Sequence, residues 1–465
     1  MGNTATKSKK GYPFGFYACS LGFTFERCAF YTVKWLLAIW LATETTSKMG
    51  GMGLTSVEAG KISAYFVAAT YITPMIGGYL ADYWVSPRLC VVLGMILMGA
   101  GYLVGWQATN LTLVWVMIIL VAVGTGLFKG NLSGVNSLMF DDQDELNSAF
   151  SVQYSFVNIG SFIGTTFVVL LADSQGYQFL LLIAGILLLV DAVWFLANGK
   201  ALGNKGKEPF KKDQRSFVDK DKKAAEESKP LTTGDKKRVF AIIIVTLLSA
   251  IFWIAWYMSY NVVYYYFGFG DSSEFLNWAD WSLFGWKIPQ TSYFDSLNAL
   301  TCIVLGPVFA IVWAKMAARP KGDMSMFKKT AIGIFLVGLS YVAMVLANII
   351  RGDGQCSWFW VILIALLMSV GEMIFSPLGN SFISMFAPAK LMGLLLGFWP
   401  IAVFIATLIY PSLYGALDAG SRAGKFNLYY GIIAAVVIVC AVLLYAFSGK
   451  LDKLADERSE ERRVG

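Results

Sequence analysis

The sequence predicts an all-α membrane protein with twelve transmembrane helices in two six-helix bundles. The chain has 465 residues, of which 57% are hydrophobic and only 14% are charged, whereas soluble domains carry roughly 25% charged residues. Apolar runs of about 20 residues, the length that crosses a bilayer as a helix, recur from end to end. One polar insertion, residues 199–237, divides these runs six and six.

Each apolar run of sufficient length is expected to form one transmembrane helix. The expected spans are 12–42, 58–82, 88–107, 111–130, 148–172, 178–197, 238–267, 294–316, 327–349, 357–385, 391–414 and 426–448. Several contain a proline, which membrane helices tolerate: Pro74, Pro307, Pro377, Pro400 and Pro411. The pattern Gly160-Ser-Phe-Ile-Gly164 has small residues at the spacing that lets two membrane helices approach closely.

The polar insertion suggests a duplicated transporter. Residues 1–198 are expected to form the N-terminal six-helix bundle and residues 238–449 the C-terminal one, with a tail at 450–465. Residues 199–237 are rich in Lys, Asp and Glu, so a flexible linker or a short surface helix is expected there. Two halves of similar size place the substrate site at their interface.

Lys and Arg residues predict the orientation. Thirteen lie between Lys200 and Arg238, and the N-terminus, the 8–9 loop and the C-terminal tail add more on the same side. The opposite loops carry only Lys48, Lys287, Arg351, Arg422 and Lys425. The positive-inside rule then puts both termini and the linker in the cytoplasm of a multi-pass plasma-membrane protein, in a bacterium the inner membrane. No cleavable signal peptide is expected.

The composition argues against several classes of function. There is no histidine, and the six cysteines lie at no metal-ligand spacing. No nucleophile–base pair stands out, so an enzyme is not expected, nor is any metal or cofactor. The net charge of +7 follows the topology and does not indicate a nucleic-acid partner. The expected partners are the lipid bilayer, small peptides and protons, and the expected assembly state is a monomer.

Charges inside the spans are the strongest functional signal, because ionised groups at membrane depth cost several kcal/mol unless they are paired or face water. In the first span Glu26, Arg27 and Lys34 share one helical face with Tyr31. A polar and aromatic face on an otherwise apolar helix is typical of a helix that lines a wet cavity. The other deep charges are Lys61, Asp82, Lys129, Asp191 and Glu372.

Not all of these charges are expected to have a function. Lys61 and Asp191 have weak sequence context and are expected to be paired or to reach toward the membrane surface. Asp82 lies in Gly77-Gly-Tyr-Leu-Ala-Asp82-Tyr-Trp-Val-Ser-Pro-Arg88, which resembles the loop between helices 2 and 3 of major facilitator transporters. The resemblance implies that Asp82 anchors a cytoplasmic gate and does not touch substrate.

Five further motifs resemble the proton-dependent oligopeptide transporter family of the major facilitator superfamily, in order along nearly the whole chain. They are Arg27-Cys-Ala-Phe-Tyr31, Gly124-Thr-Gly-Leu-Phe-Lys129-Gly-Asn131, Tyr154-Ser-Phe-Val-Asn158-Ile-Gly160, Ser296-Leu-Asn298 with Pro307, and Gly371-Glu372-Met-Ile-Phe-Ser376-Pro377. The resemblance implies the major facilitator fold. It also implies import of di- and tripeptides with protons by alternating access.

The resemblance also implies roles for individual residues. The peptide carboxylate is expected at Arg27, Lys34 and Lys129, and the peptide amine at Glu372. Such a site suits a zwitterion, because it offers a cationic wall and an anionic wall. The remaining expected contacts to substrate are Tyr31, Tyr65, Tyr154, Asn158, Trp253, Asn298, Ser376 and Trp399.

The chain departs from the family where proton coupling is concerned, which makes it an atypical member. Phe23 stands where the family has an acid, and no acid follows Trp253 in helix 7. We therefore expect three bases and two acids in the cavity, and a gating residue, Lys34, that has lost its partner. Glu26 is expected to pair with Arg27 and Lys129, which leaves Glu372 to carry the proton.

Two alternatives to a peptide symporter remain open from the sequence. One is a major facilitator transporter of another zwitterion or anion, such as an amino acid, a modified peptide or a drug. The other is a peptide sensor that binds without transporting, which the missing acids would suit.

The sequence yields one direct test of the proton carrier. Glu372→Gln should abolish proton-driven uptake without preventing folding, because the amide keeps the shape of the side chain but cannot titrate. Uptake of labelled dipeptide into liposomes with and without a pH gradient measures this. Normal accumulation driven by a pH gradient in the variant would rule out the assignment.

Overall fold

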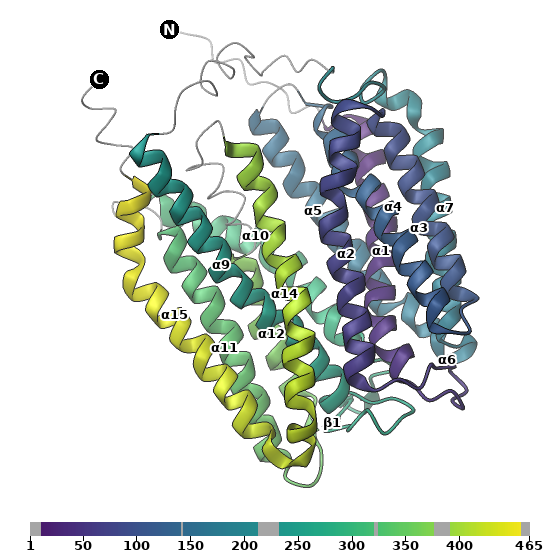
Figure 1. Ribbon diagram of the computed structural model, residues 1–465, viewed down its shortest axis with the longest axis vertical. Helices are drawn as coiled ribbons and strands as arrows, with labels where there is room; N and C mark the ends of the chain where they lie inside the picture. Colours follow the sequence, from purple (N-terminus) through teal and green to yellow (C-terminus); the bar gives the residue numbers. More distant parts are fainter. Residues whose placement is uncertain (1–10, 141–142, 213–231, 320–323, 376–390, 457–465) are drawn as a thin grey trace.

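The computed structural model describes residues 11–140, 143–212, 232–319, 324–375 and 391–456. Long helices form two groups that stand side by side (Figure 1). In the first group the long helices are α1 (Phe14–Ala42), α2 (Ser56–Tyr83), α3 (Pro87–Trp106), α4 (Leu111–Ser137), α5 (Gln143–Thr166) and α7 (Tyr177–Ala197). A 3₁₀ turn at Val168–Leu171 and the short helix α6 (Ala172–Gln175) link α5 to α7.

The second group contains α9 (Thr233–Val262), α10 (Tyr293–Ala317), α11 (Met326–Arg351), α12 (Phe359–Phe375), α14 (Met392–Gly420) and α15 (Phe426–Asp456). A π-helical turn, Val263–Phe267, extends α9. In the described ranges, four two-residue strands lie in the connections: β1 (Ala279–Asp280), β2 (Ser282–Leu283), β3 (Trp286–Lys287) and β4 (Cys356–Ser357). β1 pairs in parallel with β4, and β2 and β3 form an antiparallel hairpin.

Polar caps explain where several helices begin. Thr55 and Glu58 form a reciprocal capping box at the start of α2. The Asn110 side chain accepts a hydrogen bond from the amide of Leu113 and caps α4. Each cap satisfies an amide that would otherwise have no partner at the end of a helix. Polar residues between the apolar runs therefore determine where these helices begin.

The structure has the helix approach predicted at Gly160 and Gly164. A Cβ atom at Gly160 would lie 2.3 Å from the carbonyl oxygen of Thr24, and one at Gly164 would lie 2.4 Å from that of Cys28. The two glycines thus let the backbone of α5 touch the backbone of α1. This contact fixes the helix that carries most of the buried charges.

The two groups are joined at the end of the molecule that holds the β2–β3 hairpin, which we call the hairpin end. There Glu274 accepts a hydrogen bond from the amide of Ser56 at 2.9 Å, and Arg422 donates to the Ser56 hydroxyl at 2.9 Å. Gln290 also donates to Asp173 at 2.5 Å. The α2–α14 and α5–α10 pairs carry most of the helix contacts between the groups.

The opposite end, which we call the linker end, holds the start of α1 and the end of α15 (Figure 1). The first part of the expected flexible linker, residues 199–212, is folded here against the first group. The Arg88 guanidinium donates hydrogen bonds to the carbonyl oxygens of Gly199, Gly203 and Lys205. Phe210 packs against Gly134. Local hydrogen bonds to one arginine therefore order a segment whose polar composition predicts flexibility, while 213–231 lie outside the described residues.

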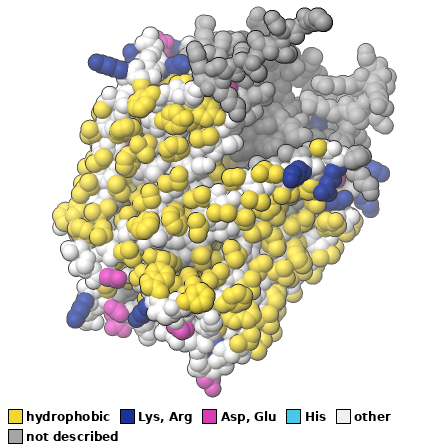
Figure 2. Space-filling model, turned by 180° about the vertical axis from the view of Figure 1, so that it is seen from behind, with side chains coloured by type: hydrophobic (Ala, Val, Ile, Leu, Met, Phe, Trp, Pro, Cys, Tyr) yellow, Lys and Arg dark blue, Asp and Glu magenta, His cyan; other side chains and the backbone are white. Residues whose placement is uncertain are grey.

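The surface agrees with a membrane protein. Eight helices of the described chain are long and apolar enough to cross a membrane by length and composition. Hydrophobic side chains cover most of the face seen in Figure 2, and Lys and Arg side chains gather toward its edges. Soluble proteins rarely expose apolar surface on this scale.

The close contact between α1 and α5 predicts that a larger residue at Gly160 destabilises the protein. Gly160→Ala should lower the free energy of unfolding by about 1–3 kcal/mol, because the added methyl group meets the backbone of α1. Gly78→Ala is the matched control, since nothing lies within 4 Å of a Cβ atom there. Thermal unfolding in detergent should separate the two variants, and equal stability would contradict the close contact.

Candidate functional site

The charged face of α1 is buried within the protein. Glu26 is 1% exposed, and Arg27 and Lys34 are each 7% exposed. Arg27 donates from Nε and Nη2 to the two carboxylate oxygens of Glu26, both at 2.5 Å. The Arg27 guanidinium also lies over the Phe30 ring, 4.5 Å from its centroid. The two neighbouring side chains therefore neutralise one another, as expected for Glu26 and Arg27.

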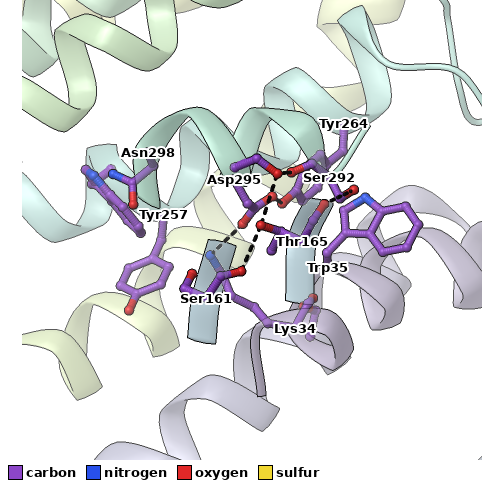
Figure 3. A network of polar contacts seen from close by, with 12 residues as sticks. Lys34, Trp35, Ser161, Thr165, Tyr257, Tyr264, Ser292, Asp295 and Asn298 are labelled. Atoms are coloured by element: carbon purple, nitrogen blue, oxygen red, sulfur yellow. Dashed lines mark hydrogen bonds and ion pairs between the residues drawn. The ribbon is translucent and has the colours of Figure 1, made fainter. Parts of the chain in front are cut away.

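Lys34 has an acidic partner, which corrects the expectation that it had lost one. Its Nζ lies 3.3 Å from Oδ1 of Asp295, in the first turn of α10 (Figure 3). The Tyr264 hydroxyl donates to the other carboxylate oxygen. Lys34 also sits 3.9 Å from the centroid of the Tyr260 ring. The partner comes from helix 8 of the expected topology, and helix 7 contributes two tyrosines in place of an acid.

Asp295 changes the charge balance of the site. With it, the buried polar centre holds three bases, Arg27, Lys34 and Lys129, and three acids, Glu26, Glu372 and Asp295. The expected excess of one positive charge was therefore wrong. Asp295 stands at the edge of the predicted span 294–316 and is not among the deep charges that the sequence indicates.

Hydroxyl groups join α5 to α10 beside this ion pair. Ser292 donates to the carbonyl oxygen of Thr165 at 2.8 Å, and Ser296 donates to the Thr165 hydroxyl at 3.0 Å (Figure 3). Trp35 of α1 donates to Thr291 at 2.9 Å. These contacts hold the first turn of α10 against the first group of helices, so that Asp295 lies within reach of Lys34.

Lys129 on α4 has no carboxylate partner among the described residues. Its ammonium group lies 4.7 Å from the centroid of the Tyr71 ring, and the Tyr71 hydroxyl is 3.4 Å from that of Tyr257 on α9. Both carboxylate oxygens of Glu26 are occupied by Arg27. The expected pairing of Glu26 with Lys129 is therefore not seen.

Glu372 lies on α12 and, like Lys129, is a charged residue of this centre. It accepts a hydrogen bond from Asn298 of α10 at 2.8 Å, and the same amide group donates to Ser369 at 3.0 Å. No basic side chain of the described chain pairs with it. No group of three His, Cys, Asp or Glu side chains in that part of the chain is arranged to hold a metal ion.

Aromatic side chains fill the space around these charges. Trp253, Trp256 and Tyr257 pack in series along α9, with ring centroids 5.0–5.6 Å apart between neighbours. The indole N–H groups of both tryptophans are buried and lack a partner in the described structure. Buried donors are normally hydrogen-bonded. These two N–H groups can therefore donate hydrogen bonds to a bound ligand.

Three further predicted residues lie toward this centre from the first group. Tyr31 is within electrostatic range of both Arg27 and Glu372. Tyr154 is within range of Glu372 and Tyr31, yet 44% of its surface is exposed. Asn158 is one helical turn beyond and donates to the Tyr154 carbonyl oxygen at 2.9 Å. Tyr154 thus reaches toward the charges of the second group from α5 while nearly half of its surface stays exposed.

Not every predicted site residue lies in this cluster. Tyr65 is 39% exposed and packs against Trp115 of α4. Asp82 lies at the linker end of α2, where its carbonyl oxygen accepts from the Lys211 amide at 3.2 Å. Ser376 lies outside the described residues, and Trp399 lies in α14 with its side chain outside the described part.

Several residues of the cluster were not predicted, among them Asp295 and the aromatic residues Tyr71, Trp256, Tyr257, Tyr260 and Tyr264. Asp295 had a usable signal, because it directly precedes the Ser296-Leu-Asn298 motif. The tyrosines had none, since aromatic residues make up 15% of the chain and only packing shows which of them face the charges.

The Lys34–Asp295 pair can be tested by a double-mutant cycle. Asp295→Asn should destabilise the protein by about 3–5 kcal/mol, because Lys34 is left buried without a counter-charge. Adding Lys34→Met should recover most of that loss, since no buried charge then remains unpaired. Thermal unfolding of the wild type, both single variants and the double variant measures the coupling, and additive losses would contradict it.

Comparison with known proteins gives a consistent result. The family model described as Major Facilitator Superfamily matches residues 19–353. Dipeptide and tripeptide permease B of Xenorhabdus bovienii is 25% identical over 96% of each chain. A peptide transporter of Yersinia enterocolitica is 26% identical over 93% of this chain and 94% of its own length.

A solved structure also has this fold. The crystal structure of the peptide transporter POT in complex with sulfate has a TM-score of 0.83 at 23% identity, with 97% of both chains covered. Both the relatives and this neighbour are transporters and not enzymes. The major facilitator fold expected from the sequence is confirmed, and the chain belongs to the Major Facilitator Superfamily.

Proposed function

We propose that this protein imports di- and tripeptides together with protons by alternating access. The observation that carries the proposal is the pair of unneutralised charges in the central cluster of described residues. Lys129 on α4 and Glu372 on α12 lack partners of opposite charge, whereas Arg27 and Lys34 are paired. A peptide zwitterion supplies both missing charges, one at each end of its backbone.

The ion pairs in the site indicate which residue binds each end of the peptide. The peptide carboxylate binds Lys129 first, since Arg27 and Lys34 are already held by acids. The peptide amine binds Glu372, which Asn298 orients. The indole N–H groups of Trp253 and Trp256 donate to the peptide backbone, and the surrounding rings accept varied side chains. The names of the relatives agree with these substrates.

The two halves, 1–198 and 238–449, act in this proposal as the moving units of a monomer. The hairpin end faces outward and the linker end faces the cytoplasm, in keeping with the Lys and Arg distribution. Contacts at the hairpin end then correspond to a closed outer gate, and the Lys34–Asp295 pair is its innermost element. Opening outward requires this pair to separate.

In this proposal Glu372 is the residue that binds the transported proton. Arg27 holds both oxygens of Glu26, so a proton on Glu26 would leave Arg27 buried without a counter-charge in this conformation. Glu372 accepts from one neutral donor and forms no ion pair among the described residues, so its protonation breaks no ion pair there. A proton on Glu372 would release the peptide amine on the cytoplasmic side.

Uptake measurements test the site. Lys129→Gln should raise KM for a dipeptide by about 10–100-fold, because a hydrogen bond to a charged group contributes about 1.5–3 kcal/mol. Lys287→Gln, on the exposed β3 strand, is the matched control. A dipeptide with an amidated C-terminus should compete poorly with the wild-type substrate, since it lacks the carboxylate.

The same assay separates the alternatives. Competition by amino acids or drugs but not by dipeptides would show a transporter of another zwitterion or anion. Binding of dipeptides without accumulation in liposomes would show a sensor. An unchanged KM in Lys129→Gln would overturn the binding scheme even if peptides are transported.

A further inference from the structure

Asp191 on α7 is a carboxyl group that the proposed transport cycle leaves unused. Its side chain is fully buried, and neither carboxylate oxygen has a hydrogen-bond partner in the described structure. The expectation that Asp191 is paired or reaches the membrane surface was therefore wrong. The helix around it, Tyr177–Ala197, is otherwise almost wholly apolar, so this acid is not explained by packing.

The backbone of α1 leaves room for this carboxyl group. A Cβ atom at Gly22 would lie 3.2 Å from Oδ1 and 3.7 Å from Oδ2 of Asp191. Leu132 of α4 approaches the same glycine, at 3.4 Å. The carboxyl group thus lies beside the backbone of α1 at Gly22, one helical turn before Glu26.

The groups that face Asp191 do not neutralise it. From α1, Cys19 and Glu26 are within electrostatic range. Arg27 is engaged by Glu26, and on α3 Arg88 donates to three backbone carbonyls of residues 199–205.

An ionised carboxylate buried in this way is therefore unfavourable. Without a donor or a cation, its desolvation costs several kcal/mol. The neutral acid avoids most of that penalty. Binding of one proton converts the carboxylate to the carboxylic acid and changes no other bond, so the proton is the ligand that this environment favours.

We propose that Asp191 is a proton-binding site of the N-terminal half that holds its proton in the conformation described. This site is distinct from Glu372. Glu26 lies within electrostatic range of it, but the Glu26 carboxylate is held by Arg27. The role in transport rests on the proposed function, whereas the protonation itself does not.

Infrared difference spectroscopy of the full-length protein in detergent tests the protonation directly. At neutral pH the wild type should show the carbonyl stretch of a buried protonated carboxyl group. Asp191→Asn, which keeps the shape of the side chain, and Asp191→Leu, which keeps the site apolar, should both lose this band. Asp353→Asn, at an exposed position, should retain it. A band of full intensity in folded Asp191 variants would overturn the proposal.

Proton-driven dipeptide uptake in liposomes tests whether the proton on Asp191 takes part in transport. Asp191→Asn should shift the dependence of uptake on pH, because one proton-binding group is gone. An unchanged pH profile would overturn the role in transport. If the wild type transports no peptide, the proposed function fails while the infrared result still decides whether Asp191 is protonated.

Discussion

Neutralisation of charge away from water is the constraint on which the centre of this protein depends. Three bases and three acids lie among aromatic side chains, and ions at that depth are costly unless they find partners. Four of the six form two ion pairs, one within α1 and one from α1 to α10. The second pair joins the two halves, so the charge balance of the core and the closure of the hairpin end are linked.

The departures of α1 from the family pattern have physical explanations in the structure. Phe23, which stands where the family has an acid, packs edge-on against Phe128. Phe30 stacks on Phe66 and receives the guanidinium of Arg27. Aromatic packing thus surrounds this part of the helix. The acid missing from helix 7 is replaced by Asp295 on α10, which reaches the same lysine from a neighbouring helix.

The two remaining charges are placed differently. Lys129 lies over a tyrosine ring and Glu372 is held by an amide, so each has a neutral partner that stabilises it without cancelling its charge. They lie in different halves, and Tyr154 of α5 reaches toward Glu372 while nearly half of its surface stays exposed. A site built in this way keeps two opposite charges available while the other charges of the core are satisfied.

The sequence by itself determined the class of the protein, the approximate helix spans and most of the charged residues at the centre. Those features follow from local patterns: apolar runs of bilayer length, glycines four residues apart and charges that interrupt apolar helices. Only the tertiary structure decided which charges pair. Asp295 meets Lys34, and Asp191 meets no partner in the described chain, because pairing depends on how helices hundreds of residues apart in sequence face one another. The orientation of α2 about its axis likewise decided that Tyr71 lies in the cluster and Tyr65 does not. A sequence motif does not determine that orientation.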